Sequence, residues 1–191
     1  MTEWFSAPPP TRLTGSERFS GCDASVGDFW SFAMSDLRMN NVRGYLAEFL
    51  VARAVGAGAN RVEWDAYDVL SPAGVKIEVK SFAYLQVWDQ RELSKPVFTG
   101  LKGRTWTPQA GESPAATFNA DVYVFCVQTA QTHETYDPLD VAQWEFFVTS
   151  QSELARLGFK SISLKTLLTI ANGPVAYDDL ANAITKASKD T

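Results

Sequence analysis

The sequence predicts a single α/β domain in which a mixed central β-sheet is flanked by helices. Apolar residues recur with helical spacing in residues 42–55 and 178–187, and nearly continuous apolar runs typical of strands lie at residues 121–127 and 144–148. No internal repeat or domain boundary interrupts these elements, so one layered domain is the economical arrangement. At 191 residues and 46% hydrophobic content, the chain is long and apolar enough for a substantial core.

The N-terminal part is predicted to contain an arm and two helices. Residues 1–21 include three consecutive prolines and are expected to be extended or flexible, which leaves residues 22–191 as the folded domain. Ser25 and Asp28 are spaced as in a capping box, which predicts that a helix begins there. The apolar side chains of that helix share one face: Phe29, Trp30, Phe32 and Ala33. The strongest helix of the chain is predicted over residues 42–55.

A β-hairpin is predicted directly after this second helix. Its strands, residues 61–70 and 75–80, are joined by a turn of sequence Ser-Pro-Ala-Gly. Apolar and charged residues alternate along the second strand: Val75, Ile77 and Val79 against Lys76, Glu78 and Lys80. One face of this strand is therefore apolar and the other fully charged. Charges on the inner side of a strand are costly unless they serve a purpose.

The register of the hairpin decides which side chains meet. A two-residue loop would set Asp68 opposite Ile77, whereas a three-residue loop ending in a left-handed Gly74 sets Asp68 opposite Glu78. The three-residue loop is predicted because it places its glycine at the required position. Side chains directly opposed across two strands have Cβ atoms about 4.5–5.5 Å apart. Two carboxylates at that distance repel each other unless a divalent cation lies between them, so the hairpin predicts a metal site.

The remaining elements follow from apolar runs, caps and breakers. Residues 95–100 are predicted to form a strand, and residues 107–119 a long polar loop. The apolar run at residues 121–127 predicts a central strand covered on both faces. The other expected elements are a strand at 144–148, a helix from Ser150 to about Gly158, a helix with apolar residues from Leu164 to Ala171, and a final helix at 178–187.

Charge is distributed unevenly along the chain. The formal net charge of -5 argues against a general nucleic-acid-binding protein. Between Lys76 and Arg104, however, six basic residues outnumber three acidic ones, and this local excess suits a polyanion. Residues 105–155 contain seven acidic residues and neither lysine nor arginine, so this part is expected to face elsewhere. The alternative is that these are ordinary solvated surface charges.

The few cysteine and histidine residues limit which cellular compartment and which kinds of metal site are expected. Cys22 and Cys126 are far apart and match no metal-ligand spacing, which favours reduced thiols in a cytoplasmic protein. The single histidine, His133, excludes a multi-histidine metal site and lies in a polar stretch expected to be a loop. Neither a secretory signal nor a membrane-spanning run is visible, so no membrane association is expected.

Three acidic residues and a lysine follow one another in a fixed order along the predicted elements. Glu48 lies on the predicted helix, Asp68 on the first hairpin strand, and the second strand carries Glu78-Val79-Lys80. This arrangement resembles the PD-(D/E)xK nuclease superfamily, whose fold is called restriction-endonuclease-like. The resemblance covers residues 42–80 by motif and extends to about residue 148 by the order of elements. Tyr67 stands where the family often has proline. Asp65 is a rival acid, but strand alternation puts it on the face opposite Asp68.

Phosphodiester hydrolysis suits these residues. Asp68, Glu78 and the backbone carbonyl of Val79 are expected to bind Mg²⁺, with Mn²⁺ as a substitute. Lys80 is expected to orient or deprotonate the attacking water, or to stabilise the charged phosphate. The resemblance implies that Glu48 holds a metal-bound water or a second metal. Alone, Glu48 reads as a surface residue of an amphipathic helix. Expected substrate contacts are Lys76, Lys102 and Arg104 to phosphates, with Ser81 and Gln86 as polar contacts at the edge of the site.

The sequence therefore predicts a Mg²⁺-dependent nuclease acting on DNA, in defence, restriction, repair or mobile-element processing. An alternative is a catalytically inactive member of the same fold that binds nucleic acid or a protein partner, which the acidic stretch at residues 105–155 could recruit. A weaker third reading is a hydrolase of another substrate. Many such nucleases pair to cut both strands, so by analogy a homodimer is also expected. A solvated surface hairpin would carry the same charges without any site.

Overall fold

The computed structural model describes residues 5, 8, 11–58, 61 and 66–190. The chain divides into two compact units, Met1–Asp36 and Leu37–Thr191. The rival acid Asp65 lies outside the described residues, together with residues 62–64 of the predicted first hairpin strand.

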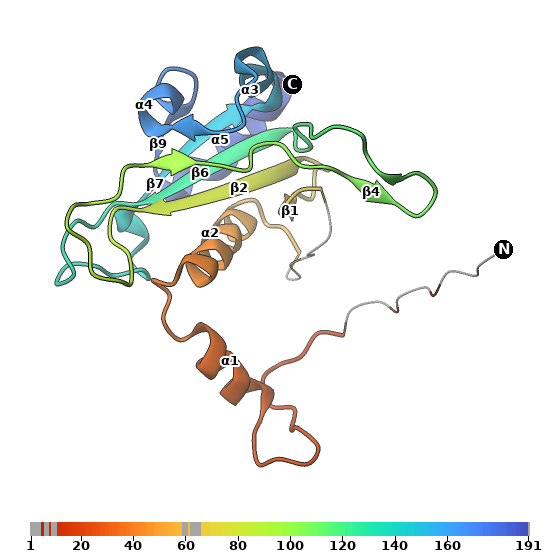
Figure 1. Ribbon diagram of the computed structural model, residues 1–191, viewed down its shortest axis with the longest axis vertical. Coiled ribbons are helices and arrows are strands. Elements are labelled where there is room, and N and C mark those ends of the chain that lie inside the picture. The colour runs from red at the N-terminus through yellow and green to blue at the C-terminus, as the bar shows by residue number, and fades with distance from the viewer. Residues whose placement is uncertain (1–4, 6–7, 9–10, 59–60, 62–65, 191) are drawn as a thin grey trace. The chain divides into compact units, whose positions relative to one another are not determined.

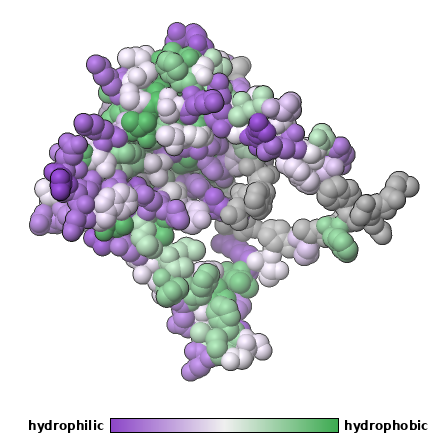
Figure 2. All heavy atoms as spheres, in the orientation of Figure 1, coloured by the Kyte–Doolittle hydropathy of each residue, from purple (hydrophilic) through white to green (hydrophobic). Residues whose placement is uncertain are grey.

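The described residues of the first unit include the helix α1 (Val26–Met34), which begins with the predicted capping box. The Ser25 side chain accepts a hydrogen bond from the Asp28 backbone, and the Asp28 carboxylate accepts one from the Ser25 backbone at 2.7 Å. None of the nine residues of α1 is buried, and Phe32 is 87% exposed. Figure 2 shows hydrophobic side chains on the surface of this unit. The predicted apolar face therefore exists, but it is exposed.

The second unit is built on a five-stranded mixed sheet, which confirms the predicted fold class. Its strands lie in the order β1-β2-β6-β7-β9. Their bounds are β1 Val69–Leu70, β2 Lys76–Ala83, β6 Val122–Gln128, β7 Trp144–Ser150 and β9 Asn172–Val175. Strands β2 and β6 are parallel, and the other neighbours are antiparallel (Figure 1). All seven residues of β6 are buried, as predicted for a central strand.

Helices cover both faces of this sheet. On one face, α2 (Asn40–Ala54) and α5 (Leu180–Ala187) pack against Ile77 and Val79 of β2 and the inward residues of β6 and β7. The other face is covered by β3 (Val97–Phe98), β8 (Ile162–Ser163), α3 (Gln151–Leu157) and α4 (Leu164–Leu167). In Figure 1, α2 and α3 lie on opposite sides of the sheet. Within the described part of the chain, none of the helices is long and apolar enough to cross a membrane.

The C-terminal elements differ in part from the prediction. Helix α3 begins at a Ser150 cap and ends at a left-handed Gly158, as expected. Helix α4 has only four residues, and strand β9 lies where the sequence predicted only the end of a helix. Gly173 explains this strand, because a Cβ there would be 2.7 Å from the Phe146 carbonyl oxygen. Only glycine lets the backbone approach β7 so closely, and proline beside it is tolerated at the edge of a sheet.

The predicted irregular loop at residues 107–119 was also partly wrong. Strands β4 (Trp106–Thr107) and β5 (Gly111–Glu112) form a short antiparallel ribbon. Gly103, before β4, and Thr117, after β5, are also paired through two backbone hydrogen bonds of 3.0 and 2.9 Å. Strands of two residues are too short to produce a recognisable alternation, so the sequence pattern could not reveal them.

Candidate active site

The hairpin has the predicted register. Val69 pairs with Ile77 and Leu70 with Lys76. The loop closes through a hydrogen bond from the Ser71 backbone to the Val75 carbonyl, and Gly74 has a φ of +83°, in the left-handed region. Beyond β1 the backbone departs from this register, because the Asp68 N–H donates to the Ile77 carbonyl at 3.0 Å, but Asp68 and Glu78 still line one pocket. The three-residue turn therefore brings the two acids to the same pocket.

The charged face of β2 is not a solvated surface. Glu78 lies beside Tyr123 of β6 and Lys80 beside Phe125, and adjacent residues on neighbouring strands point to the same face. A hydrophobic cluster that includes Phe98, Leu101 and Phe147 packs on this face of the sheet. The side chains of Glu78 and Lys80 are only 18% and 24% exposed. The reading as a simple surface hairpin is therefore wrong.

Burial and charge together shift the acidity of Glu78. Burial raises the pKa of its carboxyl above the ordinary value, and the neighbouring charge of Asp68 raises it further. The Lys80 ammonium acts in the opposite direction, since its Nζ lies 2.6 Å from Glu78 Oε1. A carboxylate under these conditions gains stability from any additional positive charge nearby.

Asp68 lies at the edge of β2, just before β1 begins. Its Oδ2 accepts a hydrogen bond from the Val79 backbone at 2.7 Å, and its own backbone N–H donates to the Ile77 carbonyl at 3.0 Å. The Asp68 carboxylate thus accepts the hydrogen bond from the Val79 N–H, because β1 does not extend far enough to pair with Val79. The N–H and C=O of one strand residue point to the same side, so the Val79 carbonyl also points toward this edge.

Lys80 lies close to Gly100 in the segment after β3. A Cβ placed on Gly100 would lie 3.8 Å from Lys80 Nζ, which is an ordinary van der Waals contact. Glycine is favoured at this position by its φ of +65°, which other residues rarely adopt. The Lys80 ammonium thus pairs with Glu78 and lies beside this segment.

Glu48 belongs to the same electrostatic cluster. It lies on α2 with its side chain 14% exposed, and Arg61 Nε is 2.5 Å from Glu48 Oε2. The Arg61 guanidinium also lies 4.7 Å from the centre of the Tyr45 ring. Burial raises the pKa of Glu48, the bond to Arg61 lowers it, and the charge of Asp68 raises it. The sequence predicted Glu48 but not Arg61, which follows α2 at a point where no pattern marks it.

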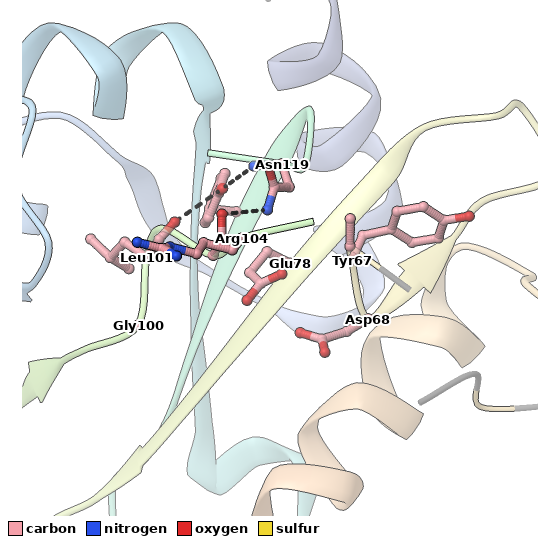
Figure 3. A pocket seen from close by; sticks show the side chains of 10 residues that line it. Tyr67, Asp68, Glu78, Gly100, Leu101, Arg104 and Asn119 are labelled. Atoms are coloured by element: carbon pink, nitrogen blue, oxygen red, sulfur yellow. Dashed lines mark hydrogen bonds between the residues drawn. The ribbon is translucent and has the colours of Figure 1, made fainter. Parts of the chain in front are cut away.

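Asp68 and Glu78 line one pocket of about 170 Å³ (Figure 3). On its other side Tyr123 Oη donates to the Leu101 carbonyl at 3.2 Å and accepts from the Asn119 backbone at 3.2 Å. Burial raises the pKa of Tyr123 to about 12, so this hydroxyl keeps its proton at neutral pH. The sequence pattern did not single out Tyr123 or Asn119. The lining is completed by Ala66, Tyr67, Gly100, Gly103 and Arg104.

Of the five predicted substrate contacts, Arg104 lines this pocket, where it forms an ion pair with Glu112 at 2.7 Å. Lys102 instead donates to the Gly158 carbonyl at 2.9 Å and lies 4.8 Å from the Phe118 ring centre. Ser81 pairs with Cys126, which puts it on the face opposite Glu78. The structure places the last two elsewhere: Gln86 is buried and donates to the Ala83 carbonyl, and Lys76 Nζ lies 5.8 Å from the Tyr67 ring centre.

The few possible ligands in the pocket suit a divalent cation that also binds water and substrate better than a metal ion surrounded by protein side chains. Among the described residues, no group of three or more His, Cys, Asp or Glu side chains could hold a metal ion. Asp68 and Glu78 nevertheless present two carboxylates to one pocket beside a backbone carbonyl. Mg²⁺ in proteins is often bound by one or two carboxylates, with waters and substrate phosphates as the remaining ligands. The residues present therefore fit Mg²⁺ or Mn²⁺.

Comparison with known proteins covers the region that contains the pocket. No curated protein matches the chain. The model of the bacteriophage T4 endonuclease IV family matches residues 32–166, which is well over half of the chain. The matched segment runs from the end of α1 to within α4 and includes Glu48, Asp68, Glu78, Lys80 and Arg104.

Proposed function

Because this chain belongs to the bacteriophage T4 endonuclease IV family, we propose that it is an endonuclease that cleaves DNA with the help of Mg²⁺ or Mn²⁺. We assign its site to the PD-(D/E)xK type, with Asp68, Glu78 and Lys80 as the residues that define it. The observation that carries this proposal is the meeting of the Asp68 and Glu78 carboxylates in one pocket, with the half-buried Lys80 ammonium 2.6 Å from Glu78. Buried charges of this kind are costly, and they are concentrated at functional sites.

Asp68, Glu78 and the Val79 carbonyl are the groups that would hold the cation. When bound, such an ion neutralises the phosphate oxygens and makes a coordinated water more acidic. The hydrogen bond from Val79 to Asp68 Oδ2 fixes the orientation of this carboxylate and leaves its second oxygen available to a ligand. The raised pKa of Glu78 supports the assignment, because a cation would relieve the repulsion from Asp68.

Lys80 is assigned to the attacking water and the developing phosphate charge. Its ammonium group is held beside Glu78 by the ion pair of 2.6 Å. A positioned ammonium can orient a nucleophilic water and stabilise negative charge in the transition state. Arg104, on the opposite rim of the pocket, is assigned to a neighbouring phosphate.

Glu48 is assigned to a supporting position rather than to direct cation binding. Its bond to Arg61 satisfies one of its oxygens at 2.5 Å. Its electrostatic interactions with Asp68 and Lys80 support a role in holding a water at the edge of the site. Replacement of Glu48 is therefore expected to weaken cleavage less than replacement of Asp68, Glu78 or Lys80.

The decisive test is nicking of supercoiled plasmid DNA with Mg²⁺ or Mn²⁺, with EDTA as the metal-free control. Lys80→Ala should lower the cleavage rate by about 10²–10⁴-fold. Exposed Lys165 on α4 offers a matched control, since Lys165→Ala removes the same charge outside the pocket and should cleave like the wild type. Circular dichroism should show that both variants are folded. Full activity of Lys80→Ala would refute the mechanism.

A second candidate function is binding of nucleic acid or a protein without cleavage. This function is favoured by the small number of side chains that could bind a metal ion. Among the described residues, only two acids, Asp68 and Glu78, line the pocket. Isothermal titration of the protein with Mn²⁺ separates the two candidates. Binding that is lost in Asp68→Asn supports the nuclease, whereas no binding at millimolar Mn²⁺ favours the second function.

A further inference from the structure

The β4–β5 ribbon starts at the rim of the candidate pocket. Gly103 and Arg104, which precede β4, line the pocket. Asn119, which follows β5 and its paired residue Thr117, also lines the pocket. Two backbone hydrogen bonds join Gly103 to Thr117, and Asn119 Nδ2 donates to the Gly103 carbonyl at 3.1 Å. In Figure 1 the ribbon projects away from the central sheet. A molecule that occupies the pocket is therefore in reach of the ribbon.

The ribbon presents an exposed aromatic ring on the side of Arg104. Trp106 is 59% exposed, whereas Trp144 in the core is only 3% exposed. Trp106 pairs with Glu112 across the ribbon, and Arg104 Nη1 contacts the carboxylate of that same Glu112 at 2.7 Å. Directly paired strand residues share a face, so Trp106 and Arg104 lie on one side of the ribbon.

The spacing of these two side chains suits a nucleic-acid strand. Residues two apart on an extended chain are about 7 Å apart, which is comparable with two nucleotides at about 3.4 Å rise. A guanidinium contacts phosphate, and an exposed indole ring can stack on any base because every base has a π-face. The one charge of residues 105–119, Glu112, is paired with Arg104 and so offers little repulsion to phosphates.

We propose that Trp106 stacks on a nucleobase of the bound DNA, next to the phosphate that Arg104 contacts at the pocket. This inference rests on the proposed nuclease function. It assigns to the β4–β5 ribbon the binding of the DNA strand beside the pocket. The stacking provides affinity with little dependence on sequence. Trp106 is a positioning residue, since it holds the strand and takes no part in breaking the bond.

The chain contains a matched control for this role. Trp88, in the segment between β2 and β3, is 54% exposed but does not line the pocket that contains Asp68 and Glu78. Removal of either ring takes away a similar exposed aromatic surface. A general effect of surface hydrophobicity would appear in both variants, whereas stacking beside the pocket would appear only at Trp106.

The first measurement is binding of a fluorescein-labelled DNA oligonucleotide by anisotropy, with Ca²⁺ in place of Mg²⁺. Trp106→Ala should raise Kd by roughly 5- to 150-fold, which corresponds to the loss of one stacked base. Trp106→Phe should retain most of the affinity, and Trp88→Ala should bind like the wild type. Equal Kd values for wild type and Trp106→Ala, or equal losses for Trp106→Ala and Trp88→Ala, would overturn the inference.

The second measurement is hydrolysis of bis(p-nitrophenyl) phosphate, a diester without bases, alongside cleavage of the oligonucleotide. Trp106→Ala should raise the KM for DNA and leave hydrolysis of the small diester unchanged. A loss of both activities would overturn the positioning role. Wild-type protein that binds DNA but hydrolyses neither substrate would refute the proposed nuclease function, while the anisotropy comparison would still decide the role of Trp106.

Discussion

Strands β2 and β6 are parallel neighbours in one sheet, yet they differ in almost every respect. They pair over seven residues, from Ile77 with Val122 to Ala83 with Gln128. Every residue of β6 is buried, whereas along residues 76–80 of β2 the apolar residues are buried and the charged residues are exposed or half-buried. The difference is located on a single face, where Phe125 of β6 packs in an aromatic cluster and Lys80 beside it forms an ion pair.

This contrast separates the part of the sheet that supplies stability from the part that supplies chemistry. Burial of aromatic side chains such as Phe125 is among the larger favourable contributions to folding. Half-burial of Glu78 beside Asp68 is unfavourable until a positive charge compensates it. We therefore expect substitutions of buried aromatic residues of β6 to act mainly on the free energy of unfolding, and substitutions of Glu78 and Lys80 in β2 to act mainly on activity.

The largest expected effect is on activity, at Glu78 in β2. Glu78→Gln should abolish metal-dependent DNA cleavage in the plasmid assay, because one of the two carboxylates of the pocket is lost. The far-ultraviolet circular dichroism spectrum should remain that of the wild type. Cleavage by this variant at the wild-type rate would contradict the assignment of the site to β2.

The same variant should be more stable than the wild type in EDTA at neutral pH. The pKa of Glu78 is raised above its ordinary value of 4.5, so the unfolded chain loses this proton first as the pH rises. Ionisation of Glu78 therefore weighs against the fold at pH 7, and this penalty is absent below the unfolded pKa. Thermal melts should show a higher Tm for Glu78→Gln at pH 7 and a difference that closes toward pH 4. Added Mn²⁺ should raise the Tm of the wild type alone.

The next largest effect is expected in β6, where Phe125→Ala should lower the free energy of unfolding by about 3–5 kcal/mol. Phe125 is fully buried and its ring lies 4.9 Å from that of Phe98. Urea denaturation measures this loss, and Phe125→Leu should recover part of it because less volume is removed. A loss below about 1 kcal/mol would show that this face is not well packed beside the site.

A smaller effect is expected at Tyr123, where the two strands meet at the pocket. Tyr123→Phe removes the hydroxyl that joins Leu101 to Asn119 and should cost about 1 kcal/mol in urea denaturation. Cleavage should fall only slightly, since the ring remains in place and the hydroxyl is assigned no chemical step. A loss as large as that of Lys80→Ala would indicate that the hydroxyl acts on the substrate.

The two cysteines provide the mildest test of burial in β6. Cys126 is fully buried and burial raises the pKa of its thiol well above the ordinary range, whereas Cys22 is exposed. The thiolate is the reactive form, so Ellman's reagent at pH 8 should modify Cys22 quickly and Cys126 only after unfolding. Mass spectrometry of the labelled protein identifies the site. Rapid labelling of Cys126 would contradict the tight packing of this strand.

Features that depend on neighbouring residues could be predicted from the sequence alone. Gly74 at the last position of a three-residue loop decided the register in which Val69 pairs with Ile77 and Leu70 with Lys76. The Ser25 and Ser150 caps placed the starts of α1 and α3. The apolar run of β6 predicted a central strand, because a strand covered on both faces has no polar side.

Contacts between distant segments were decided only by the tertiary structure. Three of these contacts join residues that share no local sequence pattern. They are the ion pair of Glu48 with Arg61, the proximity of Gly100 to Lys80, and the pocket wall formed by Arg104 and Asn119. Strand β9 likewise exists because Gly173 fits against Phe146. Local conformational preferences set the turn and the caps, whereas these contacts depend on how whole elements pack. The sequence by itself thus determined the turn and the register of the hairpin, and packing decided that Asp68 and Glu78 meet in a half-buried pocket.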